Sequence, residues 1–164
     1  MKRKAIIFGL KGINLTHEEK KLIKLHKPWG IILFSRNIKS LNQTKILIKN
    51  IKSAINDQNY PILIDQEGGR VARLNNLIDT TLFSQEFFGN IYQKNKNKFF
   101  NYYKTYVNSI CNVLDEIGVN INTVPVLDVK RSNAHKIIGN RSFSKYSEDV
   151  AKLGKIGTKL YHEK

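Results

Sequence analysis

Charged side chains follow short apolar runs of this sequence at several points. Arg36 comes just after the second run, Asp65 and Glu67 after the third, and Asp128 after the fourth. If the runs are parallel strands, these residues lie at the carboxyl ends, where barrels and open α/β sheets place their active sites. All four are therefore candidate site residues. The alternative is that strand-end carboxylates cap the next loop or pair with arginine, and for any one residue taken alone we favour that structural interpretation.

The segment Asp65-Gln66-Glu67-Gly68-Gly69-Arg70-Val71-Ala72-Arg73 concentrates such groups. Two acids and two arginines surround a glycine pair that allows the backbone to approach a ligand closely. This composition suits bidentate hydrogen bonding to a polyhydroxylated or anionic molecule. It is neither a phosphate-binding Walker loop, since no Lys-Ser follows the glycines, nor a dinucleotide fingerprint, since the glycine spacing is wrong.

Short apolar runs alternate along the chain with longer amphipathic segments. The runs are rich in Ile and Val and apolar on both faces, which is typical of buried parallel strands. They are Ala5–Leu10, Gly30–Phe34, Ile62–Ile64 and Val119–Leu127.

Helices are predicted between and after these strands. Capping boxes at Thr16 and Ser40 begin helices that run to about His26 and Asp57, and Gly118 ends a helix with apolar residues at 103, 107, 110, 114 and 117. Another helix begins at Ser147. Residues 68–98 have no clear period and predict a long excursion over one end of the sheet.

The element order β-α-β-α-β-α-β-α means a parallel sheet covered by helices. Two architectures satisfy it. One is a small, complete doubly wound sheet, and the other is the first half of an eight-stranded barrel, whose usual length of about 250 residues exceeds the 164 residues here. The pattern alone does not choose between them.

Composition narrows the function classes. The formal net charge of +15 raises the question of polyanion partners. However, 22 Lys, 18 Asn and 21 Ile indicate A+T-rich codon drift, and the lysines are spread without interleaved aromatic platforms, so no nucleic-acid partner is expected. One cysteine, Cys111, excludes an internal disulfide and multi-cysteine metal sites. The N-terminal apolar run is too short for a signal peptide or membrane span, so we expect a cytoplasmic protein without a membrane partner.

Four blocks in order resemble the family 3 glycoside hydrolases, and more narrowly the bacterial β-N-acetylhexosaminidases that remove N-acetylglucosamine from cell-wall fragments. They are Pro28-Trp29-Gly30-Ile31-Ile32-Leu33-Phe34-Ser35-Arg36-Asn37, Ile64-Asp65-Gln66-Glu67-Gly68-Gly69-Arg70-Val71-Ala72-Arg73-Leu74, Asn122-Thr123-Val124-Pro125-Val126-Leu127-Asp128-Val129 and Ile138-Gly139-Asn140-Arg141-Ser142-Phe143-Ser144. The second block, D-Q-E-G-G-R-V, is specific to this subgroup. Together they span most of the chain.

The resemblance implies a (β/α)₈ barrel and a retaining mechanism with a covalent glycosyl-enzyme intermediate. It implies that Asp65 binds sugar hydroxyls and that Arg73 and Arg141 belong to the same sugar-binding cleft. The family's Lys-His pair, histidine acid/base and aspartate nucleophile would all lie beyond Lys164. The chain's four histidines do not replace them, since none follows the family's Asp-Ser: they are His17, His26, His135 and His162.

Residues 1–164 are therefore expected to form about four βα units of a truncated barrel domain, inactive by itself. The expected partners are N-acetylglucosamine-containing glycosides, and a second polypeptide carrying the other half barrel stays open. No metal or organic cofactor is implied by ligand spacing or by the family. Alternatives are a glycoside phosphorylase, a β-glucosidase, or a non-catalytic fragment that binds a sugar or a polyanion.

Overall fold

The computed structural model describes residues 3–131 and 137–164 and contains one parallel sheet. Its strands are β1 (Lys4–Gly9), β2 (Pro28–Leu33), β3 (Ile62–Ile64) and β4 (Ile121–Asn122). The chain divides into two compact units, and the whole sheet belongs to the first, which comprises residues up to 65, 73–78 and 114–122. The second comprises residues 66–72, 79–113 and 123–164.

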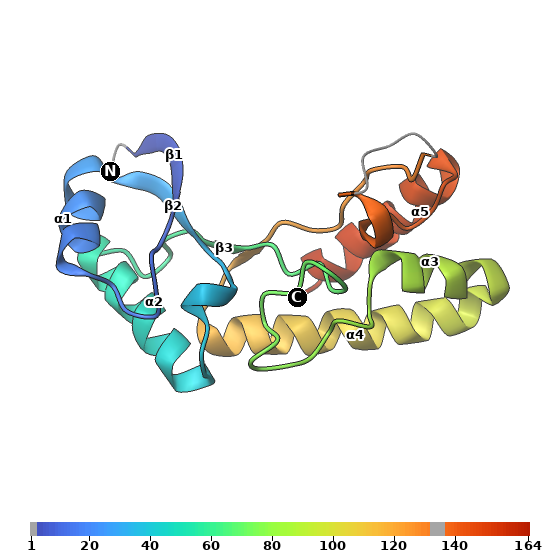
Figure 1. Ribbon diagram of the computed structural model, residues 1–164, viewed down its shortest axis with the longest axis horizontal. Coiled ribbons are helices and arrows are strands. Elements are labelled where there is room, and N and C mark those ends of the chain that lie inside the picture. Colours follow the sequence, from blue (N-terminus) through green and yellow to red (C-terminus); the bar gives the residue numbers. More distant parts are fainter. Residues whose placement is uncertain (1–2, 132–136) are drawn as a thin grey trace. The chain divides into compact units, whose positions relative to one another are not determined.

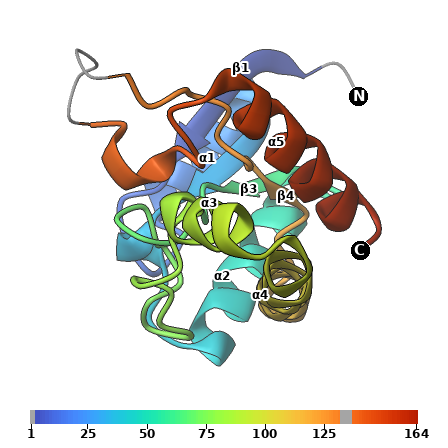
Figure 2. The same cartoon turned by 90° about the vertical axis from the view of Figure 1, so that its right-hand side faces the viewer.

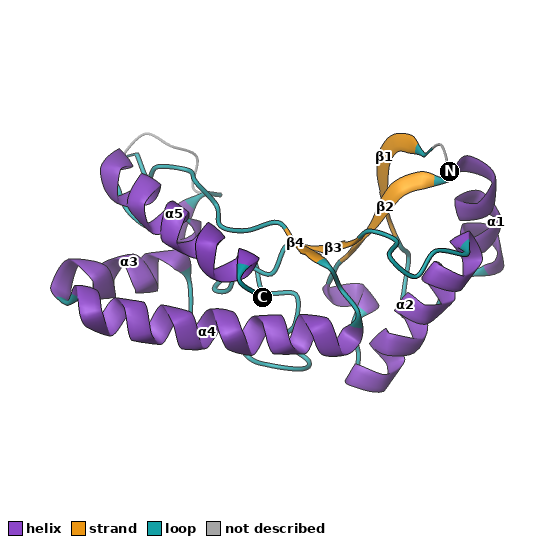
Figure 3. Ribbon diagram, turned by 180° about the vertical axis from the view of Figure 1, so that it is seen from behind, coloured by secondary structure: helices purple, strands orange, loops and turns teal. Residues whose placement is uncertain are grey.

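The order of the strands distinguishes the two architectures that the sequence left open. They lie side by side as β1-β2-β3-β4, with every neighbouring pair parallel (Figure 3). A doubly wound sheet reverses its winding at a switch point, so its first strand lies inside the sheet. Winding in one direction only is the topology of a barrel. The prediction of the N-terminal part of a (β/α)₈ barrel is confirmed.

Register brings the strand ends to one edge of the sheet. Gly9 pairs with Ile32, and Ile64 lies between Leu33 and Asn122. β3 is buried at all three of its residues, as its uninterrupted apolar sequence predicts. The segments after β1, β2 and β3 therefore begin on the same side.

The fourth strand is much shorter than the predicted Val119–Leu127. At its start the backbone N of Asn120 donates to Ile62 O at 3.2 Å, and the side chain of Asn120 adds two bonds: Oδ1 accepts a hydrogen bond from Ile62 N at 2.8 Å, and Nδ2 donates to Tyr60 O at 3.1 Å. After Asn122 the chain leaves the ladder and enters the second unit. The apolar run Val119–Leu127 thus belongs partly to the sheet and partly to the second unit, and its hydrophobicity alone does not indicate where the strand ends.

Two helices of the first unit contact each other (Figure 1): α1 (His17–His26) and α2 (Leu41–Ile55). The predicted capping box of α1 is present, because Thr16 Oγ1 accepts from Glu19 N and Glu19 caps Thr16 N in return. Ser40 caps α2. The predicted reciprocal bond is absent there, since Gln43 Oε1 instead accepts from Lys39 N.

The second unit is built on helices. They are α3 (Gln85–Lys94), α4 (Lys96–Ile117), whose last turn belongs to the first unit, and α5 (Ser147–His162). α3 and α4 lie side by side (Figures 1 and 2) and share an aromatic core, with the rings of Phe88 and Tyr103 4.8 Å apart. Within the described residues, no helix is long and apolar enough to cross a membrane.

Residues 68–98, predicted as a long excursion because they have no clear period, contain the helix α3 in their second half, which the sequence pattern did not indicate. Gly89 and several aromatic residues give α3 a low intrinsic helix propensity. The glycine is needed by packing, because a Cβ at that position would lie 1.8 Å from Phe143 O. Tertiary contact therefore decides this element.

Candidate functional site

The segment that follows β3 carries candidate groups in both units. Asp65 ends the first part of unit one, and Glu67, two residues later in the chain, belongs to unit two. Each of these carboxylates forms a bidentate pair with an arginine of its own unit. Asp65 and Glu67 thus both make the contact that the structural interpretation of strand-end acids predicts, an ion pair with arginine.

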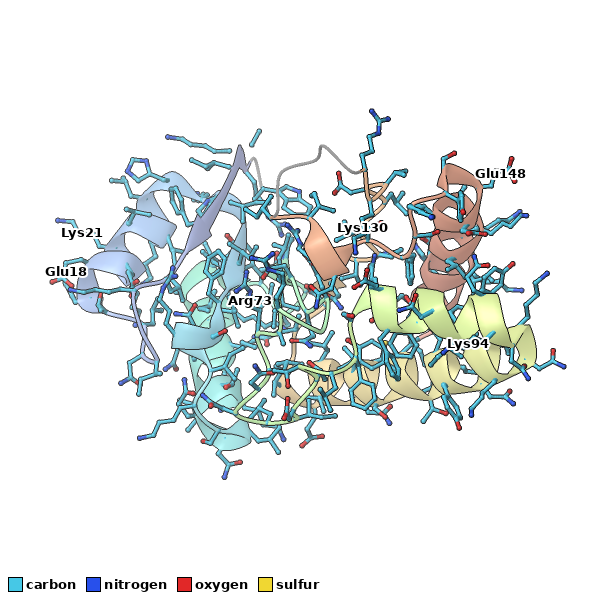
Figure 4. The ribbon with its side chains drawn as sticks, turned by 45° about the vertical axis from the view of Figure 1, so that its right-hand side comes forward. Glu18, Lys21, Arg73, Lys94, Lys130 and Glu148 are labelled. Atoms are coloured by element: carbon cyan, nitrogen blue, oxygen red, sulfur yellow. The ribbon has the colours of Figure 1, made fainter. Side chains whose placement is uncertain are left out.

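In the first unit Asp65 pairs with Arg73. Arg73 Nε and Nη2 each donate to one oxygen of the Asp65 carboxylate, both at 2.7 Å. The two side chains keep 22% and 26% exposure, so both can still reach solvent or a ligand. The Arg73 guanidinium also lies 5.5 Å from the centroid of the Phe34 ring, and Figure 4 labels Arg73 among the side chains of this segment. The ion pair and the ring fix the plane of the guanidinium.

Arg36 has a structural role at the neighbouring strand end. Its Nε donates to Leu10 O at 2.8 Å, and its guanidinium lies 4.6 Å from the centroid of the Phe34 ring. Gly9, which ends β1, leaves space for this arrangement, since a Cβ there would lie 3.0 Å from the ring and 3.2 Å from Arg36 Nη2. Arg36 therefore ties together the segments that follow β1 and β2.

In the second unit Glu67 pairs with Arg141. Arg141 Nε and Nη2 donate to the two Glu67 oxygens, both at 2.8 Å. The Glu67 carboxylate is more buried than that of Asp65, since its side chain is 4% exposed and that of Asp65 is 22% exposed. The Arg141 side chain is 24% exposed. The short 3₁₀ helix Gly139–Arg141 brings the arginine to the carboxylate. The buried charge thus has its counter-ion and two hydrogen bonds.

The glycine pair serves the loop itself. Gly68 and Gly69 have φ angles of +85° and +62°, which favour glycine. A Cβ on Gly68 would lie 2.3 Å from Phe83 O, and one on Gly69 would lie 2.6 Å from Ser84 Cβ. The glycine pair therefore lets the loop backbone lie close to Phe83 and Ser84 of the same unit.

Tyr106 supports the same loop from α4. Its hydroxyl donates to Glu67 O at 3.2 Å. Burial raises the pKa of Tyr106 well above its ordinary value of 10, so the phenol stays protonated and acts as a hydrogen-bond donor at neutral pH. It therefore fixes the backbone of the residue whose side chain holds Arg141.

Gln85 is a residue that sequence reasoning missed. It is 4% exposed, and its Nε2 donates to Val126 O at 2.8 Å and to Arg141 O at 2.7 Å, while its Oε1 accepts from Val126 N at 2.8 Å. One amide thus joins the segment after β4 to the backbone of Arg141. A Ser-Gln pair at a helix start is the available signal, but it predicts only a cap.

Asp128 is not at a strand end, because β4 ends six residues before it. Its side chain is exposed, and its carbonyl accepts from Ser142 Oγ at 2.6 Å. Of the histidines, His17 and His26 are the first and last residues of α1, His162 is the last of α5, and His135 lies outside the described residues. In the described ranges, no three His, Cys, Asp or Glu side chains gather as a metal site.

Comparisons with known proteins agree over nearly the whole chain. Residues 4–162 match the glycosyl hydrolase family 3 N-terminal domain. Beta-hexosaminidase A of Pseudoalteromonas piscicida is 34% identical over 153 residues, which cover 90% of this chain and 25% of that protein. The beta-hexosaminidase of Neisseria gonorrhoeae is 33% identical over 152 residues, covering 92% of this chain and 41% of the relative.

The structural comparison leads to the same group. The crystal structure of NagZ from Neisseria gonorrhoeae in complex with N-trifluoroacetyl-D-glucosamine superposes with a TM-score of 0.87 at 29% identity. The match covers 98% of this chain and 48% of that one. The chain thus spans less than half the length of each of these relatives.

Proposed function

This chain belongs to glycosyl hydrolase family 3, to its N-terminal domain, and we propose that it forms half of the barrel of an enzyme that hydrolyses terminal β-linked N-acetylglucosamine. The observation that carries the proposal is the match to beta-hexosaminidases over nine-tenths of the chain. A related structure that holds an N-acylated glucosamine derivative supports the same sugar class.

Within this proposal Asp65, Arg73 and Arg141 bind the terminal sugar. A carboxylate accepts hydrogen bonds from two hydroxyl groups, and a guanidinium donates in a fixed fork. The bidentate pairs support these roles, since they hold each arginine in one orientation before a ligand arrives. Preformed donors lose less conformational entropy on binding than mobile side chains do.

The chemical step is proposed to use groups outside this chain. A retaining glycosidase needs a nucleophile and an acid/base about 5 Å apart. The described histidines stand at helix ends, and the two strand-end carboxylates are each paired with an arginine. We therefore assign positioning of the sugar to this chain and the covalent double displacement to the remainder of the barrel.

We further propose peptidoglycan fragments in the cytoplasm as the natural substrate. The support is the resemblance of the D-Q-E-G-G-R-V segment, residues 65–71, to the bacterial subgroup that acts on cell-wall fragments. A fragment with a β-linked terminal N-acetylglucosamine is the substrate to compare with the matching β-glucoside. A preference for the β-glucoside would overturn this assignment.

The first test uses the chain with and without the remainder of a barrel. Alone it should release no more product from a chromogenic N-acetylglucosaminide than buffer does, because it lacks a nucleophile. Co-expression with the part of N. gonorrhoeae NagZ that this chain does not match should restore turnover. Turnover by the isolated chain that Asp65→Ala abolishes would show that the catalytic groups are misplaced.

A second test addresses Asp65 itself in the restored enzyme. Asp65→Ala removes charged hydrogen bonds worth about 1.5–3 kcal/mol each, so kcat/KM should fall roughly 10- to 200-fold. Stability should fall by only about 1 kcal/mol, because the Asp65–Arg73 pair is partly hydrated. A variant that melts early yet keeps full specific activity would make the pair structural and end the sugar-binding assignment.

A further inference from the structure

Arg141 is held at two places within the second unit. At the far end of its side chain, Nε and Nη2 donate to the Glu67 carboxylate, both at 2.8 Å. At its backbone, the carbonyl oxygen accepts a hydrogen bond from Gln85 Nε2 at 2.7 Å. The three residues belong to the same unit. All rotatable bonds of the arginine side chain lie between these two attachments, so together they determine where the guanidinium points.

Gln85, the first residue of α3, pairs with Val126 as a residue of a neighbouring strand would. Its Nε2 donates to Val126 O and its Oε1 accepts from Val126 N, both at 2.8 Å. A carboxamide can do this because it carries a donor and an acceptor side by side, as a peptide group does. The same Nε2 also donates to Arg141 O. The amide therefore sets the position of Arg141 relative to the segment that follows β4.

Burial makes these hydrogen bonds difficult to replace. Gln85 is 4% exposed. One turn further along α3, a Cβ on Gly89 would lie 1.8 Å from Phe143 O, so the helix is in direct contact with the backbone two residues after Arg141. A carbonyl group that loses its donor in such a place is left without a partner, which is costly. Without the amide, we therefore expect the backbone at Arg141 to shift toward another donor.

The carboxylate that receives the guanidinium cannot follow such a shift, because Glu67 is fixed separately. Its carbonyl oxygen accepts from the Tyr106 hydroxyl at 3.2 Å, and its backbone N donates to Val71 O at 3.0 Å. Neither contact involves Gln85. A displaced Arg141 backbone would therefore break the alignment of the guanidinium with the two Glu67 oxygens.

From this arrangement we propose that Gln85 is a positioning residue for the terminal sugar. It fixes the backbone of Arg141, so that the guanidinium meets the sugar in the orientation that Glu67 supports. The proposal rests on the proposed function, in which Arg141 binds that sugar. Gln85 itself acts only through Arg141. Displacing a group that orients the substrate by about 1 Å costs on the order of 100-fold, so the effect of losing the amide is measurable.

The first test is kinetic and uses the enzyme restored with the unmatched part of N. gonorrhoeae NagZ. Gln85→Met keeps an unbranched side chain but removes the amide, and the KM for a chromogenic N-acetylglucosaminide should rise roughly tenfold while kcat changes less than about twofold. A purely structural role would lower the Tm and the yield of active enzyme and leave KM unchanged. The control is Gln93→Met on the same helix, whose amide donates to Asp149 Oδ2 at 2.6 Å and whose KM should equal that of the wild type.

A second comparison asks whether Gln85 acts through Arg141. Arg141→Lys keeps a positive charge beside Glu67 but lacks the planar fork of the guanidinium. In that background, Gln85→Met should raise KM by less than about twofold, because the donor that it positions is already gone. A full additional increase would show that Gln85 acts independently and would overturn the proposal.

The position of Arg141 can also be tested without activity, in the chain by itself. Nitrogen-15 NMR follows hydrogen exchange at the Nε–H of Arg141, with that of Arg73 in the first unit as the internal reference. Gln85→Met should accelerate exchange at Arg141 roughly tenfold and leave Arg73 unchanged, because only the Glu67 pair loses its alignment. If Gln85→Met does not fold, Gln85→Glu replaces it: this variant keeps the acceptor for Val126 N and loses both donors.

The outcomes separate this proposal from the proposed function. An unchanged KM overturns the positioning role, and so does an Arg141 signal that exchanges as in the wild type. A restored wild-type enzyme without turnover, or one that prefers the β-glucoside, counts against the proposed function. The exchange measurement then still decides whether Gln85 holds Arg141 in place.

Discussion

Removing Arg141 and removing the charge of Glu67 should lower the free energy of unfolding by different amounts, although both substitutions break the same ion pair. Arg141→Ala leaves a carboxylate that is 4% exposed without its counter-ion, and removing one partner of a buried pair costs about 3–5 kcal/mol. Glu67→Gln leaves a guanidinium that is 24% exposed and can recover water, so about 1.5–3 kcal/mol is expected. At about 2–4 °C per kcal/mol, Arg141→Ala should lower the Tm by on the order of 10 °C.

The double variant provides the decisive comparison. Replacing both partners leaves no unpaired buried charge, so Glu67→Gln with Arg141→Ala should be more stable than the sum of the single losses by about 1–3 kcal/mol. Urea unfolding followed by circular dichroism measures all four proteins. Lys130→Ala, which breaks the more exposed pair with Glu86, is the control and should cost less than about 1 kcal/mol. Equal single losses with an additive double variant would refute the desolvation argument.

Two further predictions concern packing and pH. Gly89→Ala should destabilise the chain by about 3 kcal/mol, because its Cβ would overlap Phe143 O. The control Gly12→Ala, with nothing within 4 Å, should change stability by less than about 0.5 kcal/mol. Thermal melts compare the two variants, and equal melting temperatures would contradict the packing of α3. Burial raises the pKa of Tyr60 from 10.0 to about 12, so the unfolded chain releases this proton at lower pH than the folded chain. The contribution of the protonated Tyr60 to the free energy of unfolding is complete below pH 10 and is lost as pH rises through 12. Over that range the free energy of unfolding, measured by urea titration, should fall by about 2–3 kcal/mol more in the wild type than in Tyr60→Phe. Parallel stability curves for the two proteins would exclude this role.

The sequence predicted the elements whose signals are local. The Thr16 capping box, the apolar spacing that ends at Gly118 and the strand Ile62–Ile64 all lie where the structure has them. It failed where distant residues decide. α3 depends on Gly89 meeting Phe143, and β4 ends early although apolar residues continue to Leu127.

The candidate site shows the same division. The residue types Asp65, Glu67 and Arg73 could be selected from one segment, but the partner of Glu67 lies 74 residues away. Nothing in the spacing indicates which acid pairs with which arginine. Gln85 is a still weaker signal, because its role consists of three hydrogen bonds to backbone groups of segments 41 and 56 residues distant.

Structural pairing and sugar binding make compatible demands on the same arginines. A free arginine loses about 2 kcal/mol of rotamer entropy when a ligand orders it. In Arg73 and Arg141, two hydrogen bonds to a carboxylate already hold the guanidinium. Much of the rotamer entropy is therefore lost when the chain folds, and less remains to be lost when a ligand binds. An ion pair that contributes little net stability can thus still increase affinity, because it supplies donors in a fixed orientation. For the same reason the stability of Asp65 variants and their catalytic efficiency must be measured together, since only their difference separates an ordering contact from a sugar contact.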